Sequence, residues 1–458
     1  MRYYLMTLGC QMNLSDGERI HSVLKGMGLE QSDSDENADL VGIIACSVRQ
    51  KAIDKVYNQV ARWNRKKNHS NLITFISGCI LPDDRERFLK LFDMVFPMSE
   101  VNHLPEMIRS YGIASPASLE IPFSGIPKNE QIFSLWNIQP SYRSTFEAFV
   151  PIQNGCNKFC TFCAVPYTRG REVSRPSSEI FQQVQDLIER NYRSITLLGQ
   201  NVNSYGLDKG GKEIGFAQLL EEIGKLGTNS GKEFWVYFTS PHPRDMTSDV
   251  LDIISAYPHL AKQIHLPLQS GDDKILVKMN RNHSLEQYRE IVQGIRTKLP
   301  EATLFTDIIV GFSGETEAQH RRTMDAMNEF SFNMAYVAQY SPRPGAASFR
   351  WEDTVLKEDK RRRLHQLNEI LSTTASLHNS ALVGKTCRVL VTGTDRLPGY
   401  LKGLTEGKIN VRFPATQLSL VGEFTDLIIT GYSGLSVEGK MAPIQVAALA
   451  TDELNLQL

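Results

Sequence analysis

Three cysteines in one short segment, Cys156, Cys160 and Cys163, have the spacing C-x3-C-x2-C. Three close thiolates suit a cubane [4Fe-4S] cluster, which takes four ligands, so one iron would stay open to a substrate or cofactor. A zinc site is the alternative, but structural zinc usually takes four protein ligands in paired spacing, and this segment offers no fourth Cys or His. Buried structural thiols are a further alternative. The spacing therefore predicts an iron–sulfur site with one vacant coordination position.

A second set of cysteines, Cys10, Cys46 and Cys79, follows three strand-like segments near the N-terminus. We expect these strands over Arg2–Leu8, Asp39–Ala45 and Leu72–Ser77, and helices over Asp16–Gly26 and Gln50–Lys66. Strand–helix–strand spacing predicts a parallel α/β sheet, and ligands gather at the carboxyl ends of such strands. The three cysteines should therefore converge on a second [4Fe-4S] cluster. Three unrelated buried thiols are the alternative.

The first cysteine set lies in a longer series of alternating strands and helices. Its predicted strands are Glu147–Gln153, Ser194–Gln200, Glu233–Thr239, Gln263–Gln269, Thr303–Phe312 and Met334–Tyr340. Six βα units predict a partial (βα)6 barrel, smaller than the closed eight-unit form, with its chemistry at the strand carboxyl ends. A helix over Lys357–Leu382 follows. The short strands beyond it, Thr386–Thr392, Lys408–Phe413 and Glu423–Thr430, predict a small all-β barrel.

Composition limits the class of protein. The chain has 458 residues, 41% of them hydrophobic, and a net charge of −1, which indicates several soluble domains. No apolar run approaches a membrane span, and the N-terminus lacks the features of a signal peptide. We therefore expect a cytoplasmic protein without a membrane partner. In that reducing compartment, its seven cysteines favour metal or redox chemistry over disulfides.

The C-x3-C-x2-C segment resembles the radical S-adenosylmethionine (SAM) superfamily. The resemblance implies that the open iron binds SAM, and that reduction cleaves SAM to a 5′-deoxyadenosyl radical. It also implies that the aromatic residue before the last cysteine and several residues at strand ends contact SAM. These expected cofactor-binding residues are Phe162, Gly199, Gln200, Asn201, Gln269, Arg281, Val310 and Tyr340.

The order of elements and the local motifs resemble, more narrowly, the methylthiotransferase family. The motifs are Gly-Cys-Gln-Met-Asn at 9–13, Cys-Ser-Val-Arg-Gln-Lys-Ala at 46–52 and Gly-Cys at 78–79. The small C-terminal barrel resembles a TRAM domain, an RNA-binding module. Segments 163–172, 197–205, 279–281 and 340–345 favour the tRNA branch known as MiaB. The sequence departs from the family pattern at Ile44-Ala45, Ile80-Leu81 and Ser313, which spares all six cysteines.

The resemblance implies an architecture. We expect an N-terminal methylthiotransferase domain over 1–115, a linker over 116–145 and a radical SAM domain with its C-terminal helix over 146–382. A TRAM domain over 383–447 and a tail over 448–458 complete the chain. All six cysteines would be catalytic and would bind the iron of two [4Fe-4S] clusters.

The resemblance also implies an activity and its partners. The protein would add a methylthio group to carbon 2 of isopentenyladenosine, next to the anticodon of tRNA. Its partners would be the anticodon stem-loop and an electron donor such as flavodoxin or ferredoxin, and it would act as a monomer. Three alternatives stay open: the same chemistry on threonylcarbamoyladenosine in tRNA, the same chemistry on a ribosomal protein aspartate, and a non-catalytic RNA-binding iron–sulfur protein.

Local basic stretches could supply phosphate contacts. Residues 156–175 contain four basic residues and one acidic residue, and further basic runs lie at 62–67 and 357–363. The predicted C-terminal barrel carries seven basic and five acidic residues over 383–440. The alternative for each stretch is an ordinary solvated face.

Overall fold

The computed structural model describes residues 1–46, 50–110 and 132–443. The expected tail over 448–458 and most of the expected linker over 116–145 lie outside the described residues. The chain divides into two compact units, Met1–Ala375 and Ser376–Leu458. Within the part that the structure describes, no helix is long and apolar enough to cross a membrane.

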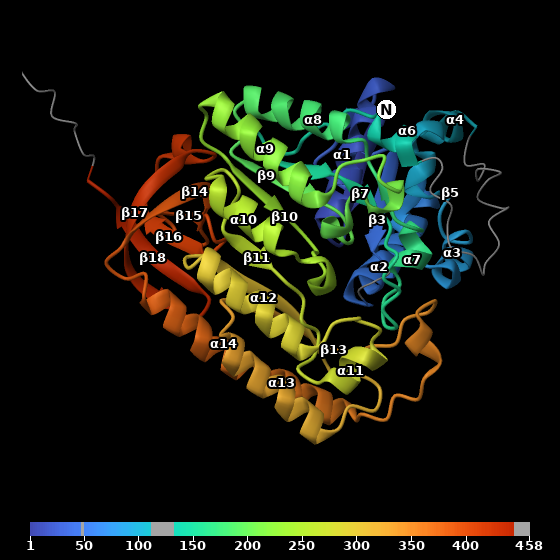
Figure 1. The fold of residues 1–458 in the computed structure, drawn as a ribbon. Helices are drawn as coiled ribbons and strands as arrows, with labels where there is room; N and C mark the ends of the chain where they lie inside the picture. Colours follow the sequence, from blue (N-terminus) through green and yellow to red (C-terminus); the bar gives the residue numbers. More distant parts are fainter. Residues whose placement is uncertain (47–49, 111–131, 444–458) are drawn as a thin grey trace, which may run out of the picture. The chain divides into compact units, whose positions relative to one another are not determined.

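A five-stranded parallel sheet begins the first unit. Its order is β2-β1-β3-β4-β5, with bounds Glu30–Gln31, Arg2–Thr7, Leu40–Cys46, Ile73–Cys79 and Met94–Val95. Helix α1 (Gln11–Gly26) packs on one face and α2 (Gln50–Lys67) on the other (Figure 1). The short helices α3, α4 and α6 span Pro82–Phe88, Leu104–Arg109 and Ile132–Trp136. The predicted parallel α/β sheet is confirmed.

The central strand β3 shows why this layering follows from the sequence. Every residue of Leu-Val-Gly-Ile-Ile-Ala-Cys is buried, as expected for a parallel strand covered on both faces. Leu40 and Ile44 pack in the core on the α1 side, whereas Val41 and Ile43 pack on the α2 side. A Cβ atom at Gly42 would lie 2.0 Å from the Phe75 ring, so that aromatic ring requires a glycine opposite it.

Six parallel strands form the central part of the first unit. They are β6 (Glu147–Pro151), β9 (Ser194–Leu198), β10 (Trp235–Phe238), β11 (Gln263–His265), β12 (Thr303–Val310) and β13 (Met334–Gln339). They form two three-stranded sheets, ordered β10-β9-β6 and β11-β12-β13, which a parallel bridge between Val236 and Leu260 joins. The six strands therefore follow one another in sequence order around an open arc, as the predicted partial barrel requires.

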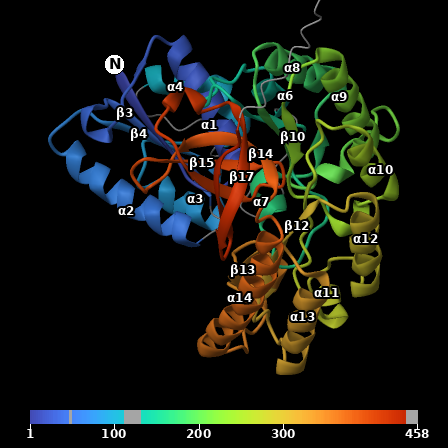
Figure 2. The ribbon, with the colours of Figure 1, turned by 90° about the vertical axis from the view of Figure 1, so that its left-hand side faces the viewer.

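Helices cover the outer face of this arc. They are α8 (Ser177–Glu189), α9 (Phe216–Ser230), α10 (Ser248–Ala256), α12 (Leu285–Lys298) and α13 (Glu317–Phe330). The short helix α11 (Asp273–Lys278) instead packs against Phe312 and Tyr340. Figure 2 shows α9, α10 and α12 side by side in one layer over the strands. Both α12 and α13 begin with a complete capping box, Ser284 with Gln287 and Thr316 with Gln319, which satisfies two otherwise unpaired amides at each start.

The strand predicted over Gln263–Gln269 ends earlier, at His265. Pro267 has no amide hydrogen to donate to a sheet, and Gln269 has a left-handed φ of +72°. Gln269 nevertheless touches β12 through an isolated parallel bridge to Ile308. The chain therefore continues alongside β12 after β11 has ended.

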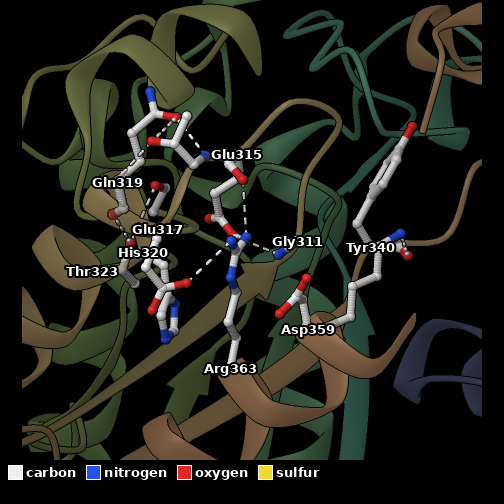
Figure 3. Close-up of polar contacts among 12 residues, drawn as sticks. Gly311, Glu315, Glu317, Gln319, His320, Thr323, Tyr340, Asp359 and Arg363 are labelled. Atoms are coloured by element: carbon white, nitrogen blue, oxygen red, sulfur yellow. Dashed lines mark hydrogen bonds and ion pairs between the residues drawn. The ribbon is translucent and has the colours of Figure 1, made fainter. Parts of the chain in front are cut away.

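The start of helix α14 (Lys357–Ser380) fixes the loop after β12. Arg363 donates to the Glu315 carboxylate at 2.8 Å, and Glu315 accepts from the Gly311 amide at 2.7 Å (Figure 3). The Lys360 ammonium donates to the Tyr340 carbonyl at 3.1 Å, directly after β13. Lys360 and Arg363 are both buried, so these two residues of the basic run at 357–363 clamp the strand ends from inside, whereas Lys357, Arg361 and Arg362 are exposed.

The second unit contains a closed five-stranded barrel in the order β14-β15-β16-β18-β17. The strands are β14 (Thr386–Thr394), β15 (Tyr400–Thr405), β16 (Asn410–Pro414), β17 (Phe424–Ser433) and β18 (Ser436–Met441). The small all-β barrel is confirmed, but sequence analysis missed β15 and β18. Each contains a glycine, which normally weakens a strand, yet a Cβ at Gly403 would lie 2.5 Å from the Val389 side chain. Here glycine permits the close strand approach that closing a small barrel needs.

The clamp on the β12 loop leads to a stability prediction. Glu315 and Arg363 form a buried ion pair, with side chains 1% and 6% exposed. Arg363→Ala would leave an uncompensated buried carboxylate, so we expect a loss of about 3–5 kcal/mol in unfolding free energy. Urea unfolding would measure it. Arg362→Ala is the matched control, because Arg362 makes only half-exposed ion pairs and should cost at most about 1 kcal/mol. Equal effects of the two substitutions would contradict this account.

Candidate active site

The three N-terminal cysteines meet at the carboxyl edge of the first sheet. Cys46 and Cys79 are paired in register as the last residues of β3 and β4. Cys10 caps the start of α1, directly after β1. Cys10 and Cys46 both interact electrostatically with the Cys79 thiol. The sheet thus gathers three thiols that are separated by more than thirty residues each in the chain.

Backbone geometry at this edge explains the Gly-Cys pairs. Gly9 has a φ of +120°, and a Cβ there would lie 2.7 Å from the Cys46 Cβ. Gly78 has a φ of +102°, and a Cβ there would lie 2.6 Å from the Ala45 carbonyl oxygen. A side chain at either glycine would therefore displace a cysteine-bearing strand end.

Asn13 holds the strand ends together from the first turn of α1. Its amide nitrogen donates to the carbonyls of Leu8 and Ala45, both at 2.7 Å. Its carbonyl oxygen lies 3.6 Å from the Cys79 sulfur. This buried side chain thereby connects the backbones that precede Cys10 and Cys46 with the third cysteine.

The loop that carries Cys156, Cys160 and Cys163 is closed at its base. Strands β7 (Gln153–Asn154) and β8 (Val173–Ser174) pair antiparallel on either side of it, and the Cys156 amide donates to Gly170 at 3.2 Å. Gly155 has a φ of +79°, and a Cβ there would lie 2.1 Å from the Arg171 carbonyl oxygen. The loop is therefore a fixed structure on the carboxyl end of β6.

The segment after α11 forms hydrogen bonds with the same loop. The Asn280 side chain donates to the carbonyls of Lys158 and Phe159 at 3.1 and 3.0 Å. Arg281 donates to the Cys160 sulfur at 3.5 Å and to the Pro267 carbonyl at 3.0 Å. The structure thus brings Arg281, one of the residues expected to bind the cofactor, into contact with the cysteine set.

Burial controls the protonation of these thiols. It raises the pKa of Cys79, Cys156 and Cys163 to about 12 each, in part opposed at Cys79 by the charge of Arg169. Without metal these thiols stay protonated at neutral pH, so a metal would have to displace their protons on binding. Among the described residues no three Cys, His, Asp or Glu side chains converge as one metal ion would need. A cubane cluster differs because each cysteine binds a separate iron.

The other expected cofactor residues surround the loop. Phe162 packs in an aromatic cluster with Phe312 and Tyr340, its ring 6.4 Å from that of Phe312. The Tyr340 hydroxyl donates to Ser348 at 2.8 Å. Val310 ends β12 with its side chain in the main hydrophobic core.

Three consecutive residues follow β9. A Cβ at Gly199 would lie 3.0 Å from Val202, so the backbone passes very close to its neighbours there. The Gln200 side chain accepts from the Gly155 amide at 2.5 Å, next to Cys156. Asn201 is buried, and its amide nitrogen donates to Asp245 at 3.1 Å.

Buried polar atoms without partners mark this end of the barrel. Within the described residues, they include the side-chain oxygens of Gln153, Asn201 and Gln269 and Nε2 of His242. Such atoms are costly to bury unless a ligand or water satisfies them. They follow β6, β9, β11 and β10, so they suit a polar ligand bound across the strand ends beside the cysteine loop, as SAM would be.

A second polar group lies on the inner face of the arc. His265 on β11 and Asp307 on β12 form a 2.8 Å contact, and the Tyr336 ring on β13 lies 5.6 Å from the His265 ring. Their strand neighbours Ile264 and Ile308 pack in the main core, so these side chains point away from the outer helices. Tyr336 is 53% exposed.

Sequence analysis did not single out two buried residues of this region. Arg169, at the end of α7 (Val165–Arg169), forms a 2.6 Å ion pair with Asp16 and donates to the Cys79 sulfur at 2.9 Å. Glu172 accepts from the Ser204 hydroxyl at 2.6 Å. The signal for both was the segment 163–172, which sequence analysis used as a family motif and whose basic residues it interpreted as possible phosphate contacts.

Several residues of the basic stretches form ion pairs within the protein. Lys158 pairs with Asp245, and Arg175 pairs with Glu179. In the run at 62–67, Arg62 pairs with Asp35 and Lys67 pairs with Asp93. These ion pairs, with the contacts of Lys360 and Arg363, occupy part of each stretch, and phosphate binding by the exposed residues that remain stays a prediction.

Comparison with known proteins gives the family. Residues 150–327 match the Radical SAM superfamily, and residues 2–97 match the Uncharacterized protein family UPF0004. A tRNA-2-methylthio-N(6)-dimethylallyladenosine synthase of Bordetella pertussis is 35% identical over 450 residues, covering 96% of this chain and 98% of that protein. A synthase of the same name from Geobacter metallireducens is 37% identical over 446 residues, covering 96% and 98%. The chain belongs to the MiaB-like methylthiotransferase family of radical SAM enzymes.

Solved structures agree with this family at the level of fold. The radical SAM methyltransferase TsrM from Kitasatospora setae, with tryptophan substrate and a SAM analogue bound, has a TM-score of 0.55 and 12% sequence identity. The match covers 76% of this chain and 75% of that chain. As a radical SAM methylthiotransferase, the protein uses SAM and a [4Fe-4S] cluster. The three thiols of the loop after β6 suit such a cluster, and the unpaired polar atoms beside the loop suit SAM.

Burial of Glu172 predicts a pH-dependent stability of this methylthiotransferase. It raises the pKa of the carboxyl from 4.5 to about 7. Between these values the unfolded chain releases a proton that the folded chain keeps, so stability falls as pH rises through this window. Glu172→Gln should remove this dependence and become more stable than wild type by about 3 kcal/mol at pH 8, but not at pH 4.5.

Urea unfolding across that pH range would measure the difference. The exposed Glu189→Gln on α8 is the control and should follow wild type. An unchanged pH dependence in Glu172→Gln would contradict the assignment of a buried, neutral carboxyl.

Proposed function

We propose that this protein adds a methylthio group to carbon 2 of isopentenyladenosine, beside the anticodon of tRNA. The observation that carries the proposal is a full-length likeness to synthases named for this product, in a chain that brings two cysteine sets into one compact unit. Radical SAM chemistry alone needs only three cysteines. A second set beside the first supports a reaction that needs both a radical and a sulfur atom.

We further propose that each cysteine set holds one [4Fe-4S] cluster. Cys156, Cys160 and Cys163 would hold the one that binds SAM, and Cys10, Cys46 and Cys79 the other. When bound, the first group would supply a radical able to take hydrogen from the adenine carbon, and the second would supply the sulfur atom of the methylthio group. The thiols of both sets are held by glycine turns and amide contacts that leave little room for rearrangement.

The chain's own residues position the reactants. Asn201, Gln269 and His242 offer unpaired buried polar atoms where SAM would lie, and Phe162 offers an aromatic edge beside the cysteine loop. Gln200 and Arg281 fix the loop itself by contacts at Gly155 and Cys160. These side chains exclude water from the radical and orient SAM rather than exchange protons with it.

The inner face of the barrel supplies a subsite for the base. A base that reacts at a ring carbon has to leave its stack, and single-stranded loops allow this more readily than duplexes. The half-exposed Tyr336 offers a stacking surface, and the His265–Asp307 pair offers polar atoms for a purine edge. The group lies on β11, β12 and β13, below the strand ends where SAM is proposed to bind.

We propose the remaining partners together with this reaction. The anticodon stem-loop is the substrate, a reduced flavodoxin or ferredoxin supplies electrons, and the protein acts as a cytoplasmic monomer. The barrel of the second unit, with seven basic and five acidic residues over 383–440, is the part whose fold suits RNA backbone contacts.

Nucleoside analysis tests the substrate. We expect tRNA from a deletion strain to lose the methylthio group of isopentenyladenosine and to accumulate the unmethylthiolated nucleoside, as mass spectrometry would show. A plasmid copy of the wild-type gene should restore the product, whereas Cys160→Ala and Cys79→Ala should not. Loss of methylthio-threonylcarbamoyladenosine or of a ribosomal protein modification would instead identify the alternative substrates. An unchanged nucleoside profile would refute the proposal.

Iron content tests the two clusters. Anaerobically reconstituted protein should bind about eight irons per chain. A variant with Cys156, Cys160 and Cys163 changed to Ala should bind about four, and so should one with Cys10, Cys46 and Cys79 changed to Ala. Cys387→Ala is the matched control and should keep all eight, because Cys387 lies in β14 of the second unit. About four irons in wild type would leave the N-terminal cysteines without a cluster.

A further inference from the structure

The side chain of Arg169 reaches from one cysteine loop to the other. Its Nε donates to the Cys79 sulfur at 2.9 Å, and one Nη donates to Asn13 at 2.9 Å and to Asp16 at 2.6 Å. These three partners lie on β4 and α1 of the N-terminal sheet, more than eighty residues away in sequence. The guanidinium therefore contacts a cysteine and the asparagine that positions it at the same time.

The backbone of Arg169 belongs to the other loop. Helix α7, which Arg169 ends, begins two residues after Cys163. The Arg169 carbonyl accepts from the Asn154 side chain at 2.9 Å, and the next residue, Gly170, accepts from the Cys156 amide. A shift of Arg169 would thus move the base of the loop that carries the radical SAM cysteines.

Burial and charge make this contact strong. The side chains of Arg169 and Asp16 are 5% and 3% exposed, so little water competes with the ion pair. An arginine guanidinium stays protonated in proteins, and the ion pair with Asp16 compensates its charge. A permanently charged donor is thereby fixed against a cysteine sulfur.

We infer that Arg169 is a positioning residue that couples the two cysteine loops. From the radical SAM loop it holds the Cys79 sulfur in place and donates a charged hydrogen bond to it. The position and reduction potential of a cluster at Cys10, Cys46 and Cys79 then depend on the loop that binds SAM. The part that concerns a cluster rests on the proposed function, whereas the contact itself does not.

Arginine suits this role better than lysine. Its rigid fork reaches the sulfur with Nε and the oxygens of Asn13 and Asp16 with Nη, whereas an ammonium is a single point charge. Hydrogen bonds to cluster sulfurs are among the factors that set reduction potential, because they stabilise the negative charge of the reduced state.

The contact is tested first without any cluster. A double-mutant cycle in the cluster-free full-length protein would compare Arg169→Gln, Cys79→Ala and the double variant by the midpoint of urea unfolding. If the two side chains interact, the shift of the double variant will differ from the sum of the single shifts. The control cycle pairs Cys79→Ala with Arg175→Gln, since Arg175 is equally buried but pairs with Glu179 and Gln183. Additive shifts in both cycles would overturn the inference, whatever the function of the protein.

The coupling is tested next in the loaded protein. With Cys156, Cys160 and Cys163 changed to Ala, only the second cluster remains, and an EPR-monitored redox titration reports its midpoint potential. We expect Arg169→Gln to shift the potential to a more negative value or to lose the iron. Arg169→Lys should shift it less, and Arg175→Gln should leave it unchanged. Asp16→Asn with Arg169→Gln removes both charges of the ion pair and provides a second variant if Arg169→Gln unfolds.

Turnover separates coupling from radical formation. In the otherwise intact enzyme, Arg169→Gln should lower methylthio transfer by at least about tenfold, and by more than it lowers formation of 5′-deoxyadenosine from SAM without tRNA. An unchanged potential together with unchanged transfer would overturn the inference. If wild type itself modifies no tRNA, the proposed function fails, and the cluster-free cycle still decides the role of Arg169.

Discussion

Parallel strands that end at a common edge are the constraint on which both halves of this site depend. Cys46 and Cys79 are neighbours because β3 and β4 run in register to their last residues. The loop with Cys156 begins just past β6, at the corresponding end of the barrel strands. The N-terminal cysteine set could not form on antiparallel strands of the same sequence, because alternate strand ends would then lie at opposite edges of the sheet.

The second feature is that charged side chains in this region form ion pairs inside the protein. Arg169, Lys158, Arg175 and Arg363 are all buried or nearly so and are paired with carboxylates. Burying ion pairs adds little net stability, so their value lies in fixed geometry. Two of these pairs adjoin the cysteine loop, and Arg363 sets the loop after β12 (Figure 3). A site that handles a radical needs such rigidity, since side chains that move could react with it.

Much of this could be predicted from sequence because the signals were local. The spacing at Cys156, the Gly-Cys pairs and the alternation of strands and helices indicated both cysteine sets and the parallel architecture. Strands β15 and β18 were missed because glycines such as Gly403 and Gly439 are typical of turns. Only the packed structure shows that a neighbouring strand lies close to each of them. The role of Arg169 was missed because its partners are far away in sequence. Without them, its charge indicated a phosphate contact. Burial, which distinguishes these two uses of arginine, is a property of the fold and not of the segment.

The central claim is that the two cysteine sets act together on one base of tRNA. It is tested most directly with unmodified isopentenyl-tRNA that carries deuterium at carbon 2 of the target adenine. Reduced enzyme and SAM should transfer that deuterium to 5′-deoxyadenosine as the methylthio nucleoside forms, and Cys160→Ala should yield neither product. Methylthio nucleoside with deuterium-free 5′-deoxyadenosine, or no 5′-deoxyadenosine at all from the wild-type protein, would contradict the account.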